Sequence, residues 1–327
     1  MGGFFMLRKW KKYGCILFLF DCAALCDYQF LSMGPSGLTA PKQKETEVSV
    51  QSGGNDRMTT MSLDAYGMGV LAKEISMDMD IETIKAQAVI VRTGIYKKMT
   101  EQEEGKELVF TDPFYTVDEM EDEWKSKMQK NYARLKEAWN ETKERILVYE
   151  DQPAYVPYCR LTNGKTRDAK EVLGTDQYPY LKSVDCAADK NAEDAFQSKE
   201  IDGTGYEITK QDSAGYVLEV KQGENVIDGD TFRNQWELPS SCYTMRQTDK
   251  KTTVITQGIG HGLGLSQNMA EELAKEGKSY KKILEYFFEG TVLKEVAENF
   301  GQHRISFFVS GKDNARGDED EQQQARS

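Results

Sequence analysis

Hydrophobic residues recur at helical spacing across residues 81–99 and predict a helix with one apolar face. Asp80 precedes this segment and can cap its first turn, because a carboxylate accepts the free backbone N–H groups there. Lys85, Arg92 and Tyr96, spaced by seven and four residues, form a second stripe on the same helix. The apolar positions are Ile84, Ala88, Val91, Ile95 and Met99.

Shorter patterns fill the chain on either side of this helix. A short apolar helix is expected to end at Glu74, a long charged helix to cover 117–143, and a late helix 279–288. Strand patterns occur at 146–149, 154–158, 180–184, 205–209, 216–220 and 253–256. Because helices and strands are grouped rather than alternating, we expect an α+β fold, a single mixed helix and sheet domain with a substrate groove.

Polar stretches set the expected limits of this domain. Residues 34–60 and 311–327 contain few large apolar side chains and predict a flexible linker and a disordered acidic tail. The folded domain is therefore expected over 61–310. Residues 1–33 pair a basic cluster with the apolar run 13–26, which indicates a signal or membrane anchor helix. Asp21 interrupts that run, and a buried core helix in an intracellular protein is the alternative.

Charge and composition narrow the partners. The 54 acidic residues outnumber 42 Lys and Arg, giving a net charge of -12, which argues against a nucleic-acid partner. Two histidines and no C-x-x-C pair leave little basis for a metal site. Cys186 and Cys242 could form a disulfide in an oxidising exterior, although the sequence does not fix their separation.

Two segments carry candidate chemistry. Glu74 lies between Ala72 and Ile75, and a carboxyl group among apolar neighbours can stay protonated and act as a general acid. An exposed carboxylate at a helix end is the alternative. In 258–267, glycines alternate around His261, which allows close approach of the backbone to a ligand, or simply a tight hairpin with a hydrogen-bonded imidazole. The segment fits neither a Rossmann nor a Walker pattern.

Several motifs in one order resemble the stage II sporulation protein D (SpoIID/LytB) family. They are Tyr66 to Glu74, Lys85-Ala86-Gln87-Ala88, Arg92-Thr93, Glu141-Thr142-Lys143, Asn163-Gly164-Lys165-Thr166, 180–185, Leu238-Pro239-Ser240-Ser241, Gly260-His261-Gly262 with Ser266-Gln267, 277–280 and Gly290-Thr291.

The resemblance implies a bacterial cell-wall protein. It implies a lytic transglycosylase that cleaves peptidoglycan glycan strands stripped of stem peptides during engulfment in sporulation, and that also stimulates a partner amidase. It assigns catalysis to Glu74, and substrate binding or its support to Lys85, Gln87, Arg92, His261, Ser266 and Gln267. No cofactor is implied, and the domain is expected on the extracytoplasmic side of the cell membrane.

One carboxyl group suffices for this chemistry. Glu74 would protonate the glycosidic oxygen and then take the proton of the C6 hydroxyl of N-acetylmuramic acid, so that a 1,6-anhydro ring closes without an activated water. Arg92 and Lys85 could bind the lactyl carboxylate of the substrate, or could instead pair with an acidic side chain such as Glu82. A non-catalytic wall-binding module that activates an amidase is the alternative function.

The chain departs from the family at two places. Cys159 stands where the family commonly has histidine, and its neighbours Arg160 and Leu161 are not metal ligands, so zinc is not predicted. Asn268 and Met269 replace the usual aromatic residue and glycine after Ser266-Gln267, which affects the expected shape of the groove.

Overall fold

The computed structural model describes residues 46–51, 58–103 and 105–296. All of these described residues belong to one compact unit of the chain. The predicted anchor and the predicted acidic tail lie outside the described residues and stay predictions. Within the described ranges, no helix combines the length and the apolar character that crossing a membrane requires.

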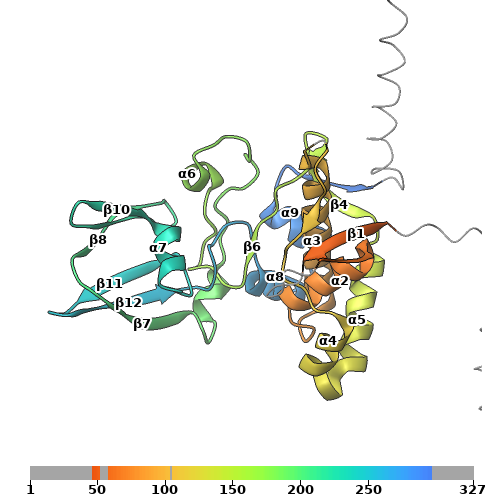
Figure 1. The fold of residues 1–327 in the computed structure, drawn as a ribbon, viewed down its shortest axis with the longest axis horizontal. Coiled ribbons are helices and arrows are strands. Elements are labelled where there is room, and N and C mark those ends of the chain that lie inside the picture. Colours follow the sequence, from red (N-terminus) through yellow and green to blue (C-terminus); the bar gives the residue numbers. More distant parts are fainter. Residues whose placement is uncertain (1–45, 52–57, 104, 297–327) are drawn as a thin grey trace, which may run out of the picture. The chain divides into compact units, whose positions relative to one another are not determined.

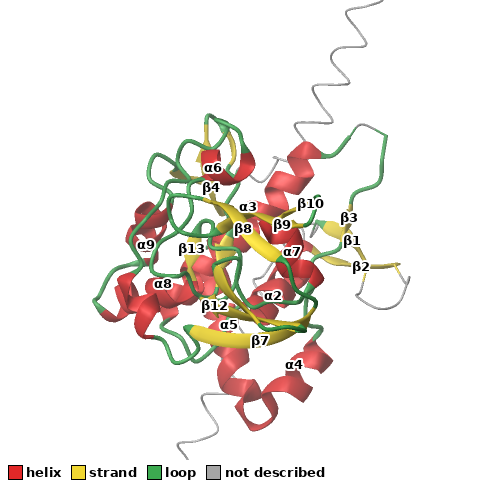
Figure 2. Cartoon of the chain, turned by 90° about the vertical axis from the view of Figure 1, so that its left-hand side faces the viewer, coloured by secondary structure: helices red, strands yellow, loops and turns green. Residues whose placement is uncertain are grey.

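One group of elements is built around a long central helix, α3, which contacts α2, α5, α8, α9 and strand β4. Figure 1 shows these elements gathered around α3, and Figure 2 shows the same helices in red. The helices of this group are α2 Leu63–Glu74, α3 Ile81–Glu101, α4 Val117–Trp124, η1 Lys125–Lys127, α5 Met128–Glu141, α8 Gln267–Lys275 and α9 Tyr280–Phe287.

The helix predicted at 81–99 is confirmed. It begins after Asp80, whose carboxylate accepts the N–H of Glu82 at 2.8 Å. Its apolar positions divide between two cores, because α3 is buried on most of its circumference. Helix α2 packs closely against α5 at Gly67, where a β-carbon would lie 2.2 Å from the Trp139 ring. Only glycine permits that approach of the two helices.

Two small sheets accompany the helices. In the order β2-β1-β3, β1 Glu47–Gln51 pairs antiparallel with β2 Met58–Ser62 and parallel with β3 Val109–Phe110. In the order β14-β4-β5, β4 Arg145–Tyr149 lies between β14 Val292–Glu295 and β5 Gln152–Pro153. The predicted linker 34–60 is therefore too long: its last part forms β1 and begins β2, because alternating residues such as Val48 and Val50 bury one face of a strand.

A second group of strands has a core of its own. Two three-stranded sheets, β10-β9-β8 and β11-β12-β7, pack with helix α7 around Val217, Val220, Phe232, Tyr243 and Val254. Helix α7 contacts β9 and β10, and Figure 2 labels α7 next to β9. The bounds are β7 Phe196–Asp202, β8 Tyr206–Gln211, β9 Val217–Gln222, β10 Asn225–Asp228, α7 Gly229–Gln235, β11 Tyr243–Gln247 and β12 Lys251–Gln257.

Four short elements complete the described chain. They are β6 Tyr158–Cys159, α6 Ala169–Leu173, η2 Ala187–Asn191 and β13 Leu265–Ser266. Strands β6 and β13 pair in parallel, so the segment after β5 and the glycine-rich segment run side by side. The mixed α+β class is confirmed.

Three predicted elements are wrong in detail. The charged helix at 117–143 is broken at Lys125, whose φ of 48° and ψ of −119° cannot continue a helix. Segment 180–184 is not a strand, because its backbone forms single contacts to the 166–169 segment instead of a ladder. Of 154–158, only Tyr158 belongs to a strand. The predictions at 146–149, 205–209, 216–220, 253–256 and 279–288 are confirmed within one or two residues.

Candidate active site

Glu74 is the last residue of α2 and is half-buried. The helix ends there because Ile75 adopts extended geometry (φ −138°, ψ 144°). The backbone carbonyl of Glu74 accepts the amide N–H of Gln267, at the start of α8, at 2.9 Å. The glycine-rich segment therefore reaches the end of α2 through its last motif residue.

Tyr158 in β6 lies against the Glu74 side chain. Burial raises the pKa of the Tyr158 phenol well above its usual value, and the charge of Glu74 and a hydrogen bond to it raise that pKa further. The phenol therefore stays protonated at physiological pH and donates to the carboxylate. Sequence reasoning missed Tyr158, because no local spacing signals a contact between β6 and α2.

A second carboxylate, Asp112, lies near enough to influence the same phenol. Asp112 accepts the hydroxyl of Tyr66 at 2.8 Å and forms an ion pair with Lys98. Glu74, in contrast, forms no ion pair with any residue that the structure describes. The two acids therefore differ: Asp112 pairs with a cation, and Glu74 pairs with none in the described part of the chain.

The glycine-rich turn holds His261 in a neutral form. Burial lowers the pKa of His261, although the charge of Asp230 opposes that change. Its Nδ1 accepts the N–H of Leu263 at 3.1 Å, which places the remaining proton on Nε2. The ring also bonds the backbone of Tyr158, the residue whose phenol meets Glu74.

Protonation of His261 would remove the acceptor at Nδ1. Because the pKa is lowered in the fold, the unfolded chain binds more protons just below the ordinary value of 6.5. The stability that His261 contributes is therefore full above pH 6.5 and falls as the pH drops below it. We expect His261→Gln to show a smaller loss of unfolding free energy between pH 7 and pH 5 than the wild type, measured by urea denaturation. Parallel curves for the two proteins would contradict this role.

Gly264 in the turn combines two constraints. Its φ is +78°, and a β-carbon would lie 2.0 Å from the Pro157 carbonyl oxygen. Gly277 has a similar φ of +84° but no atom within 4 Å of its β-carbon position. We expect Gly277→Ala to cost about 1–2 kcal/mol for backbone strain alone, and Gly264→Ala to cost about 1–3 kcal/mol more because of the clash. Equal losses in urea denaturation would contradict the close approach to Pro157.

Ser266 and Gln267 are buried and hold the start of α8 in place through hydrogen bonds. Ser266 is fully buried, caps α8 by accepting the N–H of Met269, and donates to Asp189 at 2.7 Å. Asp189 also accepts from Thr162 and, at 3.0 Å, from Asn268, so the departure at Asn268 has a local structural partner.

Gln87, on α3, contacts Gln267. It is fully buried, and its side-chain oxygen accepts a hydrogen bond from Gln267 at 3.3 Å. This hydrogen bond joins α3 to α8, and the bond from Gln267 to the Glu74 carbonyl joins both helices to the end of α2.

The predicted contact of Arg92 with a substrate carboxylate needs correction. Arg92 is only 3% exposed, stacks on Trp139 and donates to the carbonyls of Trp139 and Thr142 at 2.9 and 2.6 Å. These carbonyls belong to the end of α5, so the guanidinium stabilises that helix terminus. It has no surface at which a ligand could bind.

Lys85 pairs with acidic side chains of the fold, which was the alternative to binding a substrate carboxylate. Its ammonium group pairs with Glu82 at 2.8 Å and with Glu141 at 2.6 Å. Burial alone would lower the pKa of Lys85, but the two carboxylates raise it. Lys85 therefore ties α3 to α5, and both cations of the predicted anion site are engaged within the fold.

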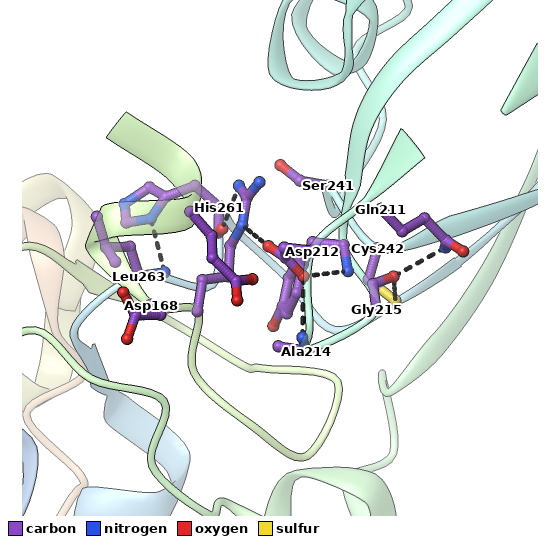
Figure 3. A network of polar contacts seen from close by, with 12 residues as sticks. Asp168, Gln211, Asp212, Ala214, Gly215, Ser241, Cys242, His261 and Leu263 are labelled. Carbon is purple, nitrogen blue, oxygen red and sulfur yellow. Dashed lines mark hydrogen bonds and ion pairs between the residues drawn. The ribbon is translucent and has the colours of Figure 1, made fainter. Parts of the chain in front are cut away.

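A largely buried ionic network contacts the glycine-rich turn (Figure 3). Arg167 pairs with Asp212 at 2.6 Å and with Asp230 at 2.8 Å, and donates to the His261 carbonyl at 3.2 Å. Asp212 also accepts the backbone N–H groups of Ala214 and Tyr216. The network fixes the backbone of the turn to the second group of strands.

The three described cysteines are free thiols, so the possible bridge between Cys186 and Cys242 is not formed. Burial, with the charge of Asp189, raises the pKa of Cys159 to about 12. A thiol this buried is a poor metal ligand, because metals bind the thiolate. Among the described residues no cluster of three or more His, Cys, Asp or Glu side chains could hold a metal ion.

Comparison with known proteins identifies the family. Residues 51–149 match the model of the family described as stage II sporulation protein (SpoIID). The stage II sporulation protein D of Bacillus amyloliquefaciens is 29% identical over 285 residues, covering 80% of this chain and 82% of that protein. That of Bacillus subtilis (strain 168) is 28% identical over 282 residues, covering 79% and 82%. The chain belongs to the stage II sporulation protein D family.

One further match is short. A protein of Bacillus subtilis (strain 168) named amidase enhancer is 39% identical over 54 residues, which is 16% of this chain and 8% of that protein. In this member of the SpoIID family, the structure brings Glu74, His261, Ser266 and Gln267 into one connected region through Tyr158 and the Gln267 amide.

Proposed function

We propose that this protein is a peptidoglycan lytic transglycosylase in which Glu74 acts first as general acid and then as general base. The observation that carries the proposal is the setting of Glu74: a half-buried carboxyl group without an ion-pair partner among the described residues, met by the Tyr158 phenol. The neighbouring Asp112 is paired with Lys98 and is a weak candidate for a second catalytic carboxylate. This favours a mechanism that needs one acid only.

In this mechanism Glu74 donates its proton to the glycosidic oxygen as the bond to the muramic acid C1 breaks. The carboxylate that results is stabilised by the phenol O–H of Tyr158. It then accepts the proton of the C6 hydroxyl while the C6 oxygen bonds to C1, which closes the 1,6-anhydro ring and restores the acid. The neutral imidazole of His261 fixes the backbone of the glycine-rich turn by accepting the N–H of Leu263. The side-chain amide of Gln267 fixes the end of α2 by donating to the Glu74 carbonyl.

The direct test is incubation of the purified protein with glycan strands that lack peptides, followed by mass analysis. The expected products are fragments with 1,6-anhydro-muramyl ends, which are lighter by one water than hydrolysis products. Hydrolysed ends alone would show a glycosidase that activates water. No cleavage at all would contradict the enzymatic proposal.

A wall-binding module that activates an amidase is the second candidate, favoured by the short match to the amidase enhancer. The two candidates differ in their dependence on Glu74: amidase stimulation and glycan binding should both survive Glu74→Gln in the second, whereas formation of anhydro-muramyl ends should be lost in the first. Membership of the SpoIID family is consistent with a role in sporulation, with the domain outside the cytoplasm and held by the N-terminal segment. Localisation of a fluorescent fusion in sporulating cells tests the role in sporulation. Access of an external protease to the domain tests its location outside the cytoplasm.

A further inference from the structure

Arg233 on α7 is a half-buried cation whose guanidinium has few hydrogen-bond partners among the described residues. Its Nε is buried and has no hydrogen-bond partner in the described part of the chain. The one hydrogen bond from its guanidinium to a described residue is long, from Nη2 to the Pro239 carbonyl at 3.5 Å. A guanidinium offers five N–H donors, so most of its binding capacity is unused by the fold.

The nearest acid on the same helix does not neutralise it. Asp230, one turn before Arg233, accepts Arg167 at 2.8 Å on one oxygen and the Ser241 hydroxyl on the other. Arg167 therefore occupies the carboxylate that Arg233 would otherwise use. Among the described residues Arg233 forms no ion pair with an acidic side chain.

The position of Arg233 is beside the glycine-rich turn. The Pro239 carbonyl that receives Arg233 also accepts the N–H of Gly260 at 2.8 Å, and the N–H of Ser241 bonds the Gly260 carbonyl at 3.3 Å. The guanidinium and the backbone just before His261 thus share one acceptor. The charge of Arg233 also contributes to lowering the pKa of His261.

We propose that Arg233 binds the free lactyl carboxylate of a muramic acid residue and thereby selects strands without stem peptides. This inference rests on the proposed function. A stem peptide converts the lactyl carboxylate into a neutral amide, which removes the partner that a planar guanidinium binds in bidentate fashion. Arg92 and Lys85 are engaged inside the fold, whereas Arg233, beside the glycine-rich turn, has no acidic partner among the described residues and keeps its guanidinium for such a charge.

Binding is measured on the full chain with Glu74→Gln, so that strands are not cleaved. The probes are two muramic acid tetrasaccharides, one with free lactyl carboxylates and one with the same groups as neutral primary amides. Arg233→Gln is compared with Arg246→Gln, because Arg246 is an exposed arginine of β11 away from the turn. We expect a preference for the free acid of about tenfold or more, lost in Arg233→Gln and kept in Arg246→Gln.

Equal binding of acid and amide by the parent protein, or an unchanged preference in Arg233→Gln, would overturn the proposal, as would the absence of binding to either sugar. If Arg233→Gln does not fold, Arg233→Lys carries the test, since it keeps the charge and loses the fork. An unchanged preference in that variant counts against Arg233. A preference that depends on Arg233 in a protein that yields no anhydro ends would retain this inference and refute the transglycosylase.

Discussion

Replacing Glu74 with glutamine is expected to lower the rate of 1,6-anhydro-muramyl product formation by about a hundredfold or more, with glycan binding retained. Glutamine keeps the size and the polarity of the side chain but cannot donate or accept the proton that the mechanism transfers. The backbone contact from Gln267 to residue 74 uses the carbonyl oxygen and is preserved. Product should be quantified by mass spectrometry after incubation with peptide-free strands.

Glu289→Gln is the matched control, because Glu289 is an exposed glutamate for which the described residues provide no ion pair. Its activity should equal that of the wild type. Thermal unfolding of all three proteins checks that the Glu74 variant is folded. Undiminished product from Glu74→Gln would remove Glu74 from the mechanism and leave Asp112 as the carboxylate to test.

Replacing Arg167 with methionine should lower the unfolding free energy by about 3–5 kcal/mol, the loss typical when one partner of a buried ion pair is removed. Arg167 and Asp212 are both buried, and the guanidinium joins Asp212, Asp230 and the His261 carbonyl. Methionine fills similar space but leaves the Asp212 carboxylate buried without a counter-charge. Urea denaturation at neutral pH measures the change.

Two further variants test whether the loss of unfolding free energy comes from the buried ion pair of Arg167. Arg160→Met removes an exposed ion pair with Asp194 and should cost at most about 1 kcal/mol. Adding Asp212→Asn to Arg167→Met should recover part of the loss, because the uncompensated charge is then gone. A loss that is equally small at both arginines, or that grows in the double variant, would show that the network is not what stabilises the turn.

Arg92 shows where sequence reasoning succeeds and where it stops. The stripe of Lys85, Arg92 and Tyr96 follows from helical spacing, and α3 forms where that spacing predicts it. The stripe does not reveal its surroundings. Arg92 lies over Trp139 and the end of α5, which approach α3 only when the chain folds.

The site itself divides in the same way. The glycine and histidine pattern at 258–267 was recognisable from residue types, since few residues other than glycine adopt the positive φ found at four of its positions. Tyr158, Asp189 and Arg233 were not recognisable. Each acts through contacts with residues far away in the sequence, and a tyrosine, an aspartate or an arginine is common in any surface loop or helix.

By itself, the sequence determined the local elements, the order of the family motifs and the two segments that hold Glu74 and His261, because periodicity and glycine placement act over a few neighbouring residues. Only the tertiary structure decided which charged groups are used up in the core and which remain for a ligand. That choice depends on burial and on long-range pairing, which place Arg92, Lys85 and Arg167 among fixed partners and leave Glu74 and Arg233 without a counter-ion among the described residues.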